Sequence, residues 1–255
     1  MLSIQVDPGW VTSSLLLWLR LAALFFLTPV FAGFKGPTSV LVILSLALAG
    51  LLSAAWQGPH AATPLSLGGL FMGGLSEVFI GMVMAFGVHA AFAAFGAAGQ
   101  IVDLQIGFGA GATFDPITRS NAPVFAAALG SLATVTFFAM DAHHALMRGV
   151  AFSVAQIPPG TLPSAMSADA IVRQFGAIFT LAVALIAPVF VVLLLLEAGL
   201  AVISRMLPQM NVFFVGMPVK ILLGLGVLSA TASMLPAVMG RAFASIFVFW
   251  TQVLR

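Results

Sequence analysis

LSLGGLFMGGLSEVFIGMVMAFGVHAAFAAFGAA, residues 65–98, contains only two ionisable side chains, those of Glu77 and His89. A helix needs about 20 predominantly apolar residues to cross the hydrocarbon core of a bilayer, which is roughly 30 Å thick. The segment Leu65–Ala98 is longer than that. Further apolar segments are Val11–Phe31, Thr38–Trp56, Pro123–Met140, Ile171–Val202, Val219–Met239 and the shorter Ala242–Leu254. The sequence therefore predicts an all-α integral membrane protein of about six to seven hydrophobic helices.

The composition excludes several classes of protein. Of the 255 residues, 62% are apolar and only 6% are charged. In soluble domains about 45–50% of the residues are apolar and about 25% are charged. So few charges cannot cover the surface of a soluble protein. An ordinary soluble enzyme, a disordered protein and a nucleic-acid-binding protein are thereby excluded. Cysteine is absent, which excludes disulfides and thiolate metal sites.

The polar connections between the apolar segments are short. The longest are Gln100–Asn121, Asp141–Gly160 and Arg205–Met217, and none can hold a soluble domain. Residues 1–255 are therefore expected to form a single membrane domain. The residues before Trp10 include Asp7 but no Lys or Arg. A secretory signal has a positive N-terminal region, so the first apolar segment is expected to be retained as a span.

The distribution of cations gives no membrane orientation. Cytoplasmic loops of membrane proteins carry an excess of Lys and Arg. A serpentine through the predicted spans instead places equal numbers of cations on the two sides, with Lys35, Arg119, Arg205 and Lys220 on one and Arg148, Arg173, Arg241 and Arg255 on the other. A simple serpentine of spans is therefore not favoured.

Ionisable residues inside the apolar segments are expected to have partners. An ionised side chain at the bilayer centre costs at least about 2.5–3.5 kcal/mol, so it should face protein or water. Arg20, Glu77, His89 and Glu197 are such residues, and Arg20 and Glu77 could pair across helices. Such groups could serve a proton-coupled transporter, or they could join helices in an assembly.

Gly107, Gly109 and Gly111 alternate with other residues in a Gly-rich segment that also contains Phe108 and Phe114. The segment lacks the Lys and Ser/Thr of a phosphate-binding loop, and no strand precedes it. Irregular backbone at membrane depth must be buried in protein or line a cavity. The segment is either a loop that lines or plugs a pore, or an ordinary connection outside the membrane.

Two other polar segments leave alternatives open. Asp141, His143 and His144 suggest a metal site or a proton relay, but adjacent side chains on a helix point about 100° apart. An interfacial polar turn is therefore favoured. PQMNVFFVGMPVKILLGL, residues 208–225, contains Asn211, Pro218 and Lys220. It fits either a broken helix at a transporter's midplane site or a tight re-entrant turn.

Four segments together resemble the FliR family of flagellar export-apparatus proteins. They are RLAALFFLTPVFAGFKGP at 20–37, AAGQIVDLQIGFGAGATFDPITRSNAPVF at 97–125, DAHHALMRGVAFSVAQIPPG at 141–160, and the segment at 208–225. The resemblance covers nearly the whole chain in order. The related SctT group of injectisome proteins shares the architecture, and the last segment looks more flagellar than injectisome-like.

The resemblance implies a non-enzymatic structural subunit of a flagellar type III export gate, with no cofactor and no nucleic acid. It implies a helical assembly with FliP-like and FliQ-like subunits, an FlhB-like switch protein, membrane lipid, and unfolded flagellar proteins as cargo. It places the chain in the bacterial inner membrane, at the flagellar basal body. The positions that match the family's plug loop are Gly107, Phe108, Gly109, Ala110, Gly111, Thr113 and Phe114. Those expected to pack subunits, or to be polar within the membrane, are Arg20, Glu77, Asn211, Pro218 and Lys220.

Other functions remain as alternatives. An injectisome export gate of the SctT type would fit the same resemblance. A small-solute secondary transporter would use Arg20, Glu77 and the region near Asn211, although it needs internal pseudo-symmetry and the sequence shows no convincing repeat. An intramembrane enzyme using Asp141, His143 and His144 lacks a nucleophile motif and a metal motif.

Overall fold

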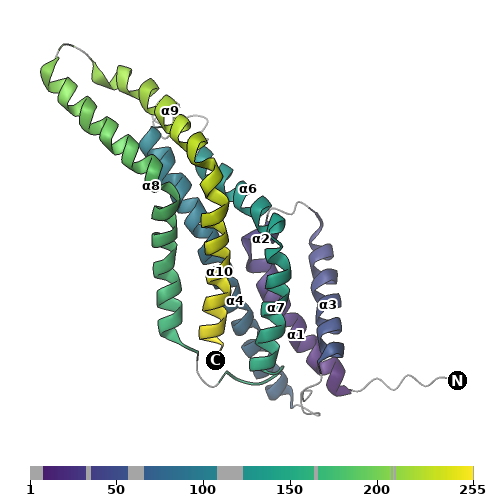
Figure 1. Cartoon of the computed structure of the whole chain (residues 1–255). Helices are drawn as coiled ribbons and strands as arrows, with labels where there is room; N and C mark the ends of the chain where they lie inside the picture. The colour runs from purple at the N-terminus through teal and green to yellow at the C-terminus, as the bar shows by residue number, and fades with distance from the viewer. Residues whose placement is uncertain are drawn as a thin grey trace. The chain divides into compact units, whose positions relative to one another are not determined.

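Long apolar segments form helices because every backbone polar group in lipid must find its partner within the protein. The computed structural model describes residues 8–32, 36–56, 66–107, 123–163, 166–207, 209 and 211–254, and within these ranges there is no strand. The helices, in chain order (Figure 1), are α1 Pro8–Leu27, α2 Pro29–Ala32, α3 Thr38–Ala55, α4 Leu67–Ile106, α6 Val124–Ala139, α7 Ala142–Gln156, α8 Ala168–Met206, α9 Val212–Thr231, the 3₁₀ turn η2 Ala232–Met234, and α10 Leu235–Val253. The all-α prediction is confirmed.

Five helical segments of the described chain are long and apolar enough to cross a membrane. They are α1, α3, α4, α8 and the segment Phe214–Val253, which contains most of α9 together with η2 and α10. Helices α6 and α7 satisfy the same criteria only as a pair that is broken at Met140 and Asp141, and they raise the number to six. The chain is therefore a membrane protein, as the sequence predicts.

The segment 142–156 forms helix α7. The sequence predicts a polar connection there, with an interfacial polar turn at Asp141, His143 and His144, and this prediction is wrong. The buried residues of α7 recur every three or four positions: Ala142, Leu146, Gly149, Val150, Ser153 and Val154. This spacing places them on one face, while the exposed face carries the polar side chains that suggested a connection. Asp141 precedes the helix in the left-handed conformation, with φ of 54°, which Asp tolerates better than most residues.

The predicted helix Val219–Met239 is wrong in its bounds. Helix α9 begins earlier, at Val212, and ends at Thr231, and α10 begins at Leu235. The interruption precedes Pro236, which has no N–H to donate to the backbone oxygen of Ala232 one turn earlier. The N–H of Leu235 is bonded to that oxygen instead, in a 3₁₀ turn. Pro is tolerated in the first turn of a helix, so Pro236 fits near the start of α10. The predicted tail helix Ala242–Leu254 is thus the second half of a longer helix.

The described residues form two compact units. The first takes its residues from Met1–Ala90, Asp141–Phe175 and Phe243–Arg255, and the second from Ala91–Met140 and Gly176–Ala242. The helices α4, α8 and α10 therefore contribute residues to both units.

In the first unit, α4 packs closely against α1 and α10. A Cβ atom added at Gly81 of α4 would lie 2.5 Å from the backbone oxygen of Arg20 in α1, so only glycine fits there. Trp250 of α10 is fully buried, and its Nε1 donates a hydrogen bond to the backbone oxygen of Met84 at 3.0 Å. The helix α3 joins α1 through a 3.1 Å hydrogen bond from Trp18 Nε1 to Ser45 Oγ.

In the second unit, α4 approaches α6 closely at Gly99, where an added Cβ atom would overlap the backbone of Ala126. Phe92 of α4 packs on Phe137 of α6, with ring centroids 6.0 Å apart. A Cβ atom added at Gly224 of α9 would lie 2.6 Å from Ile106 of α4. Close approach through glycine therefore holds helices together in this unit as well.

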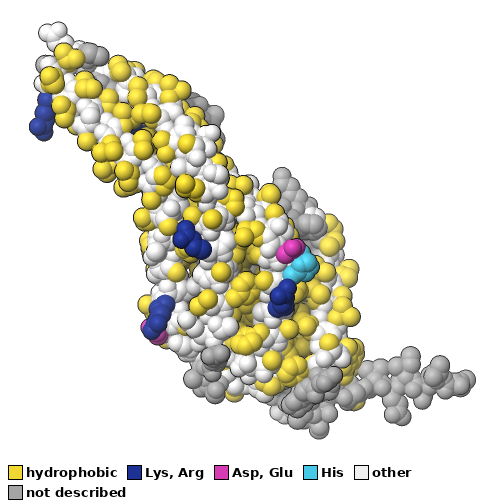
Figure 2. All heavy atoms as spheres, in the orientation of Figure 1, with side chains coloured by type: hydrophobic (Ala, Val, Ile, Leu, Met, Phe, Trp, Pro, Cys, Tyr) yellow, Lys and Arg dark blue, Asp and Glu magenta, His cyan; other side chains and the backbone are white. Residues whose placement is uncertain are grey.

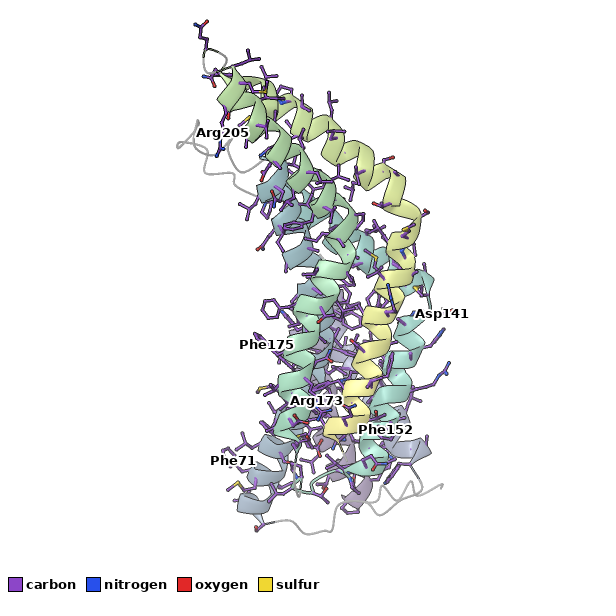
Figure 3. The ribbon with its side chains drawn as sticks, turned by 60° about the vertical axis from the view of Figure 1, so that its left-hand side comes forward. Phe71, Asp141, Phe152, Arg173, Phe175 and Arg205 are labelled. Atoms are coloured by element: carbon purple, nitrogen blue, oxygen red, sulfur yellow. The ribbon has the colours of Figure 1, made fainter. Side chains whose placement is uncertain are left out.

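The surface is largely apolar. Hydrophobic side chains cover much of the face drawn in Figure 2, and Lys and Arg appear there only as isolated side chains. In α3 only 17% of the apolar window is buried within the chain. Phe71 of α4 and Phe175 of α8 project away from their helices (Figure 3), with exposed fractions of 72% and 54%. Such surfaces require lipid or other apolar protein around them.

Replacing Gly81 with alanine tests the α1–α4 contact. We expect G81A to destabilise the protein, because the new methyl group meets the rigid backbone of Arg20 and the helices must move apart. Gly50 of α3 is the matched control, since an added Cβ there has nothing within 4 Å. G50A should be neutral, or stabilising by up to about 1 kcal/mol through helix propensity. Thermal unfolding in detergent measures both, and equal stability of the two variants would contradict the close contact.

Candidate functional site

A buried ion pair joins α1 to α4 in the first unit. Arg20 Nε lies 2.6 Å from Glu77 Oε2, and Arg20 Nη2 donates a second hydrogen bond to Glu77 Oε1 at 3.1 Å. The side chains are 1% and 0% exposed. A guanidinium fork that meets a carboxylate through two parallel bonds is the strongest geometry for such a pair. The predicted pairing of Arg20 with Glu77 is confirmed.

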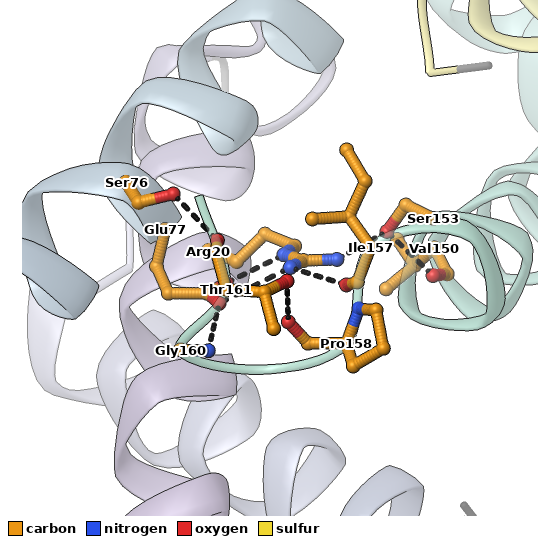
Figure 4. Close-up of polar contacts among 9 residues, drawn as sticks. All are labelled: Arg20, Ser76, Glu77, Val150, Ser153, Ile157, Pro158, Gly160 and Thr161. Carbon is orange, nitrogen blue, oxygen red and sulfur yellow. Dashed lines mark hydrogen bonds and ion pairs between the residues drawn. The ribbon is translucent and has the colours of Figure 1, made fainter. Parts of the chain in front are cut away.

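The same two side chains also hold the end of α7 and the turn that follows it (Figure 4). Arg20 Nη1 donates to Ser153 Oγ at 3.1 Å, and Nη2 donates to the backbone oxygen of Ile157 at 2.9 Å. Glu77 Oε1 accepts the backbone N–H of Gly160 at 2.9 Å. Three chain segments therefore meet at one pair of opposite charges: α1, α4, and the end of α7 with its following turn.

The turn itself is held by short-range bonds. Thr161 Oγ1 donates to the backbone oxygen of Pro158 at 2.7 Å, and Ser76 Oγ donates to the backbone oxygen of Thr161 at 3.0 Å. Gly160 has φ of 80°, in the left-handed region that glycine adopts without strain. Sequence reasoning missed Ser153, Ile157 and Gly160 as partners. The motif IPPG at 157–160 signals the turn, but not what the turn contacts.

This cluster is closed rather than open to a ligand. The bonds from Arg20 and Glu77 go to protein atoms, and neither side chain is accessible. Buried charges that are paired and hydrogen-bonded in this way fix an arrangement of helices. The cluster has the geometry of interhelical packing and offers no entry for a solute.

A second ion pair lies within the second unit. Lys220 Nζ of α9 lies 2.6 Å from Glu197 Oε1 of α8, and both side chains are partly exposed. Pro218 stands inside α9, which is continuous from Val212 to Thr231, so the helix is not broken at Gly216 or Pro218 as expected. The helices are interrupted earlier in the predicted segment, between the end of α8 at Met206 and the start of α9 at Val212. Asn211 precedes α9 and is exposed, and its backbone oxygen accepts the N–H of Phe214 at 3.1 Å.

The Gly-rich segment is described only at its first residue. Gly107 ends α4 with φ of 92°, and its N–H donates to the backbone oxygen of Asp103 at 3.2 Å. The other expected plug positions lie outside the described residues: Phe108, Gly109, Ala110, Gly111, Thr113 and Phe114. Their assignment to a plug stays a prediction.

Asp141, His143 and His144 lie closer together than the sequence analysis expected. One ligand atom from each can be chosen so that all lie within 4.8 Å of one another, and the two rings are 4.1 Å apart. Asp141 stands immediately before α7 (Figure 3), and His144 Nδ1 lies 3.5 Å from its Oδ1. Asp141 and His144 are exposed, and polar groups of this kind at a helix start are common without a metal, so no metal site is assigned.

The chain matches a known family along most of its length. The family model described as "Bacterial export proteins, family 1" matches residues 11–246. The flagellar biosynthetic protein FliR of Pectobacterium carotovorum subsp. carotovorum is 28% identical to the chain over 96% of the chain and 94% of the relative. FliR of Escherichia coli (strain K12) is 28% identical over 68% of the chain and 67% of the relative. The Yop proteins translocation protein T of Yersinia pestis is 31% identical over 56% of each.

Removing one charge of the buried pair should be far more costly than removing both. We expect R20M to destabilise the protein by about 3–5 kcal/mol, because Glu77 is left buried without its cation. The double variant R20M/E77M should recover part of that loss, since no unpaired charge remains. Thermal unfolding of the detergent-solubilised protein measures the difference.

The control for this prediction is R173M. Arg173 pairs with Asp169 at 2.6 Å across one turn of α8, but both side chains are mostly exposed. Such pairs contribute about 0.3–0.5 kcal/mol, so R173M should unfold close to the wild-type temperature. An R20M protein as stable as R173M would show that the Arg20–Glu77 pair does not hold the first unit together.

Proposed function

The chain belongs to the FliR family, within the bacterial export proteins, family 1, and from this membership we propose that it forms part of the channel of a flagellar protein export gate. It is a FliR-family flagellar export protein and a non-enzymatic membrane component of the export apparatus. The observation that carries the proposal is the family match over residues 11–246. The proposed location is the bacterial inner membrane, at the flagellar basal body.

The physical properties of the described residues support a role as a subunit. Two pairs of opposite charges are formed within the chain between apolar helices, Arg20 with Glu77 and Lys220 with Glu197. Large apolar side chains remain exposed on α3, α4, α8 and α9. A chain that pairs its buried charges internally and exposes apolar faces is suited to packing against other apolar helices. We propose FliP-like and FliQ-like subunits as the neighbours, with an FlhB-like protein as a further partner.

We assign the chain to a flagellar rather than an injectisome apparatus. The FliR of Pectobacterium carotovorum subsp. carotovorum aligns with 96% of the chain, whereas the Yop translocation protein aligns with 56%. The cargo would then be unfolded flagellar proteins. An SctT-type injectisome subunit remains the alternative on the same fold.

We further propose that the segment 107–114 plugs the closed channel. The segment combines glycines with Phe108 and Phe114. Apolar side chains at a constriction exclude water and ions, and glycines allow the backbone to be displaced when a polypeptide passes. The alternative of a small-solute transporter is disfavoured, because its expected site residues Arg20 and Glu77 lie in a closed cluster.

Deleting residues 107–114 should make the gate leak. We expect cells that produce the whole export gate with this deletion to lose membrane potential and admit small hydrophilic solutes, because the closed channel would lack its apolar seal. A potential-sensitive dye and solute uptake measure the leak, and cells with the wild-type gate are the control. An assembled gate that carries the deletion and stays impermeable would contradict the plug.

The partners are tested by co-isolation. We expect the chain, extracted in mild detergent, to be recovered in a complex with FliP-like and FliQ-like subunits, because its exposed apolar faces are covered in the assembly. Mass spectrometry of the purified complex identifies them. A stable monomer that takes up metabolites in proteoliposomes would instead support the transporter.

A further inference from the structure

The helical hydrogen bonding of α1 is interrupted at Pro29, where α2 begins. Pro29 has no N–H to donate to the backbone oxygen of Phe25, and Thr28 Oγ1 donates to that oxygen instead, at 3.3 Å. The N–H of Phe31, which a continuous helix would bond to Leu27, is bonded to the backbone oxygen of Thr28 at 3.3 Å. The backbone oxygen of Leu27 therefore ends α1 without its helical donor.

A side chain of α4 supplies the missing donor. His89 Nδ1 lies 2.9 Å from the backbone oxygen of Leu27. A backbone oxygen can only accept a hydrogen bond, so Nδ1 must carry the proton. The contact therefore fixes the tautomer of the neutral ring: Nδ1 is the donor, and Nε2 carries a lone pair and is an acceptor. The partner that the sequence predicts for His89 is thus a backbone atom of α1.

The second ring nitrogen of His89 lies at an apolar surface. His89 is exposed, and the bond to Leu27 is its one hydrogen bond among the described residues. The ring belongs to α4, which is long and apolar enough to cross a membrane. Leu75 and Met82 precede it by about four and about two turns, on the same face, and are 57% and 47% exposed. An exposed acceptor therefore stands beside apolar side chains on this helix.

Neither lipid nor water suits both parts of this surface. Hydrocarbon offers no donor to Nε2, and a polar group in hydrocarbon without a hydrogen bond is costly. Water would satisfy Nε2 but would leave the side chains of Leu75 and Met82 in contact with it. An apolar helix that carries an N–H or O–H side chain satisfies both, because polar side chains hydrogen-bond across helices in apolar surroundings.

We propose that His89 Nε2 accepts a hydrogen bond from an N–H or O–H side chain on an apolar helix of a neighbouring subunit. The donor helix packs on the face of α4 that carries Met82 and His89. The inference rests on the proposed function, because it requires a chain that assembles with other membrane subunits. His89 then makes two contacts: Nδ1 holds the end of α1 within the chain, and Nε2 binds the neighbour.

Two variants separate the internal contact from the external one. The amide nitrogen of asparagine can take the place of Nδ1, whereas the amide group of the longer glutamine can take the place of Nε2. H89N therefore keeps the donor to Leu27 and removes the acceptor at the Nε2 position, and H89Q does the reverse. M82L is the matched control, because it replaces an exposed apolar side chain of the same face with another.

Thermal unfolding in detergent measures the internal contact, and titration with FliP-like and FliQ-like subunits measures the external one. We expect H89N to unfold near the wild-type temperature but to need about fivefold more of these subunits for half-maximal complex formation, the effect of one hydrogen bond of ordinary strength. H89Q should unfold at a lower temperature, and its folded fraction should bind as the wild type does. M82L should match the wild type in both measurements.

Diethyl pyrocarbonate, which acylates an unprotonated imidazole nitrogen, tests the contact without a substitution. We expect His89, located by mass spectrometry, to be modified in the isolated chain and to be protected several-fold in the complex. Equal modification in both would overturn the proposal, because Nε2 would then be open in the assembly. Wild-type binding by H89N would likewise reject the His89 contact alone, whereas a wild-type chain that does not bind these subunits would reject the proposed function.

Discussion

The first unit depends on one constraint: Arg20 and Glu77 are buried charges that can exist there only as a pair. Separating α1 from α4, or sliding one along the other by a turn, would leave both charges without partners in an apolar environment. The bonds to Ser153, Ile157 and Gly160 extend that constraint to the end of α7 and its following turn. The glycine contact at Gly81 lies one turn further along α4, so the ion pair and the close backbone approach enforce the same register.

In the second unit a buried polar group also fixes how two helices meet, but its partners are different. Asp103 is a single buried carboxylate whose partners are backbone N–H groups of α6 rather than a cation. Its neighbour in the helix, Gly99, again provides the close backbone approach. In both units a buried polar group specifies which turn of one helix meets which part of another, and glycine makes the contact possible. Apolar packing alone would leave that register loosely defined.

The use of buried polar groups for helix register explains how a chain with so few charges can serve as a subunit of an export apparatus. Its buried ionisable groups are used for internal register, and its large exposed apolar side chains remain available for contact with lipid or other subunits. Burial of such surface, rather than reaction chemistry, is what a structural component of a channel must provide.

The sequence by itself determined the all-helical membrane character, since long apolar segments in lipid have almost no alternative to helices. It also indicated that Arg20 and Glu77 could pair, because a charge in such a segment requires an opposite charge nearby. It did not reveal α7, because Asp141, His143 and His144 obscured the apolar face that begins at Ala142. Nor did it reveal the end of α9 at Thr231, where the effect of Pro236 was overlooked. The partners Ser153, Ile157 and Gly160, and the cap of α6 by Asp103, were decided only by the tertiary structure: they depend on which backbone atoms of distant helices come within hydrogen-bonding distance, and no local pattern in the chain specifies that.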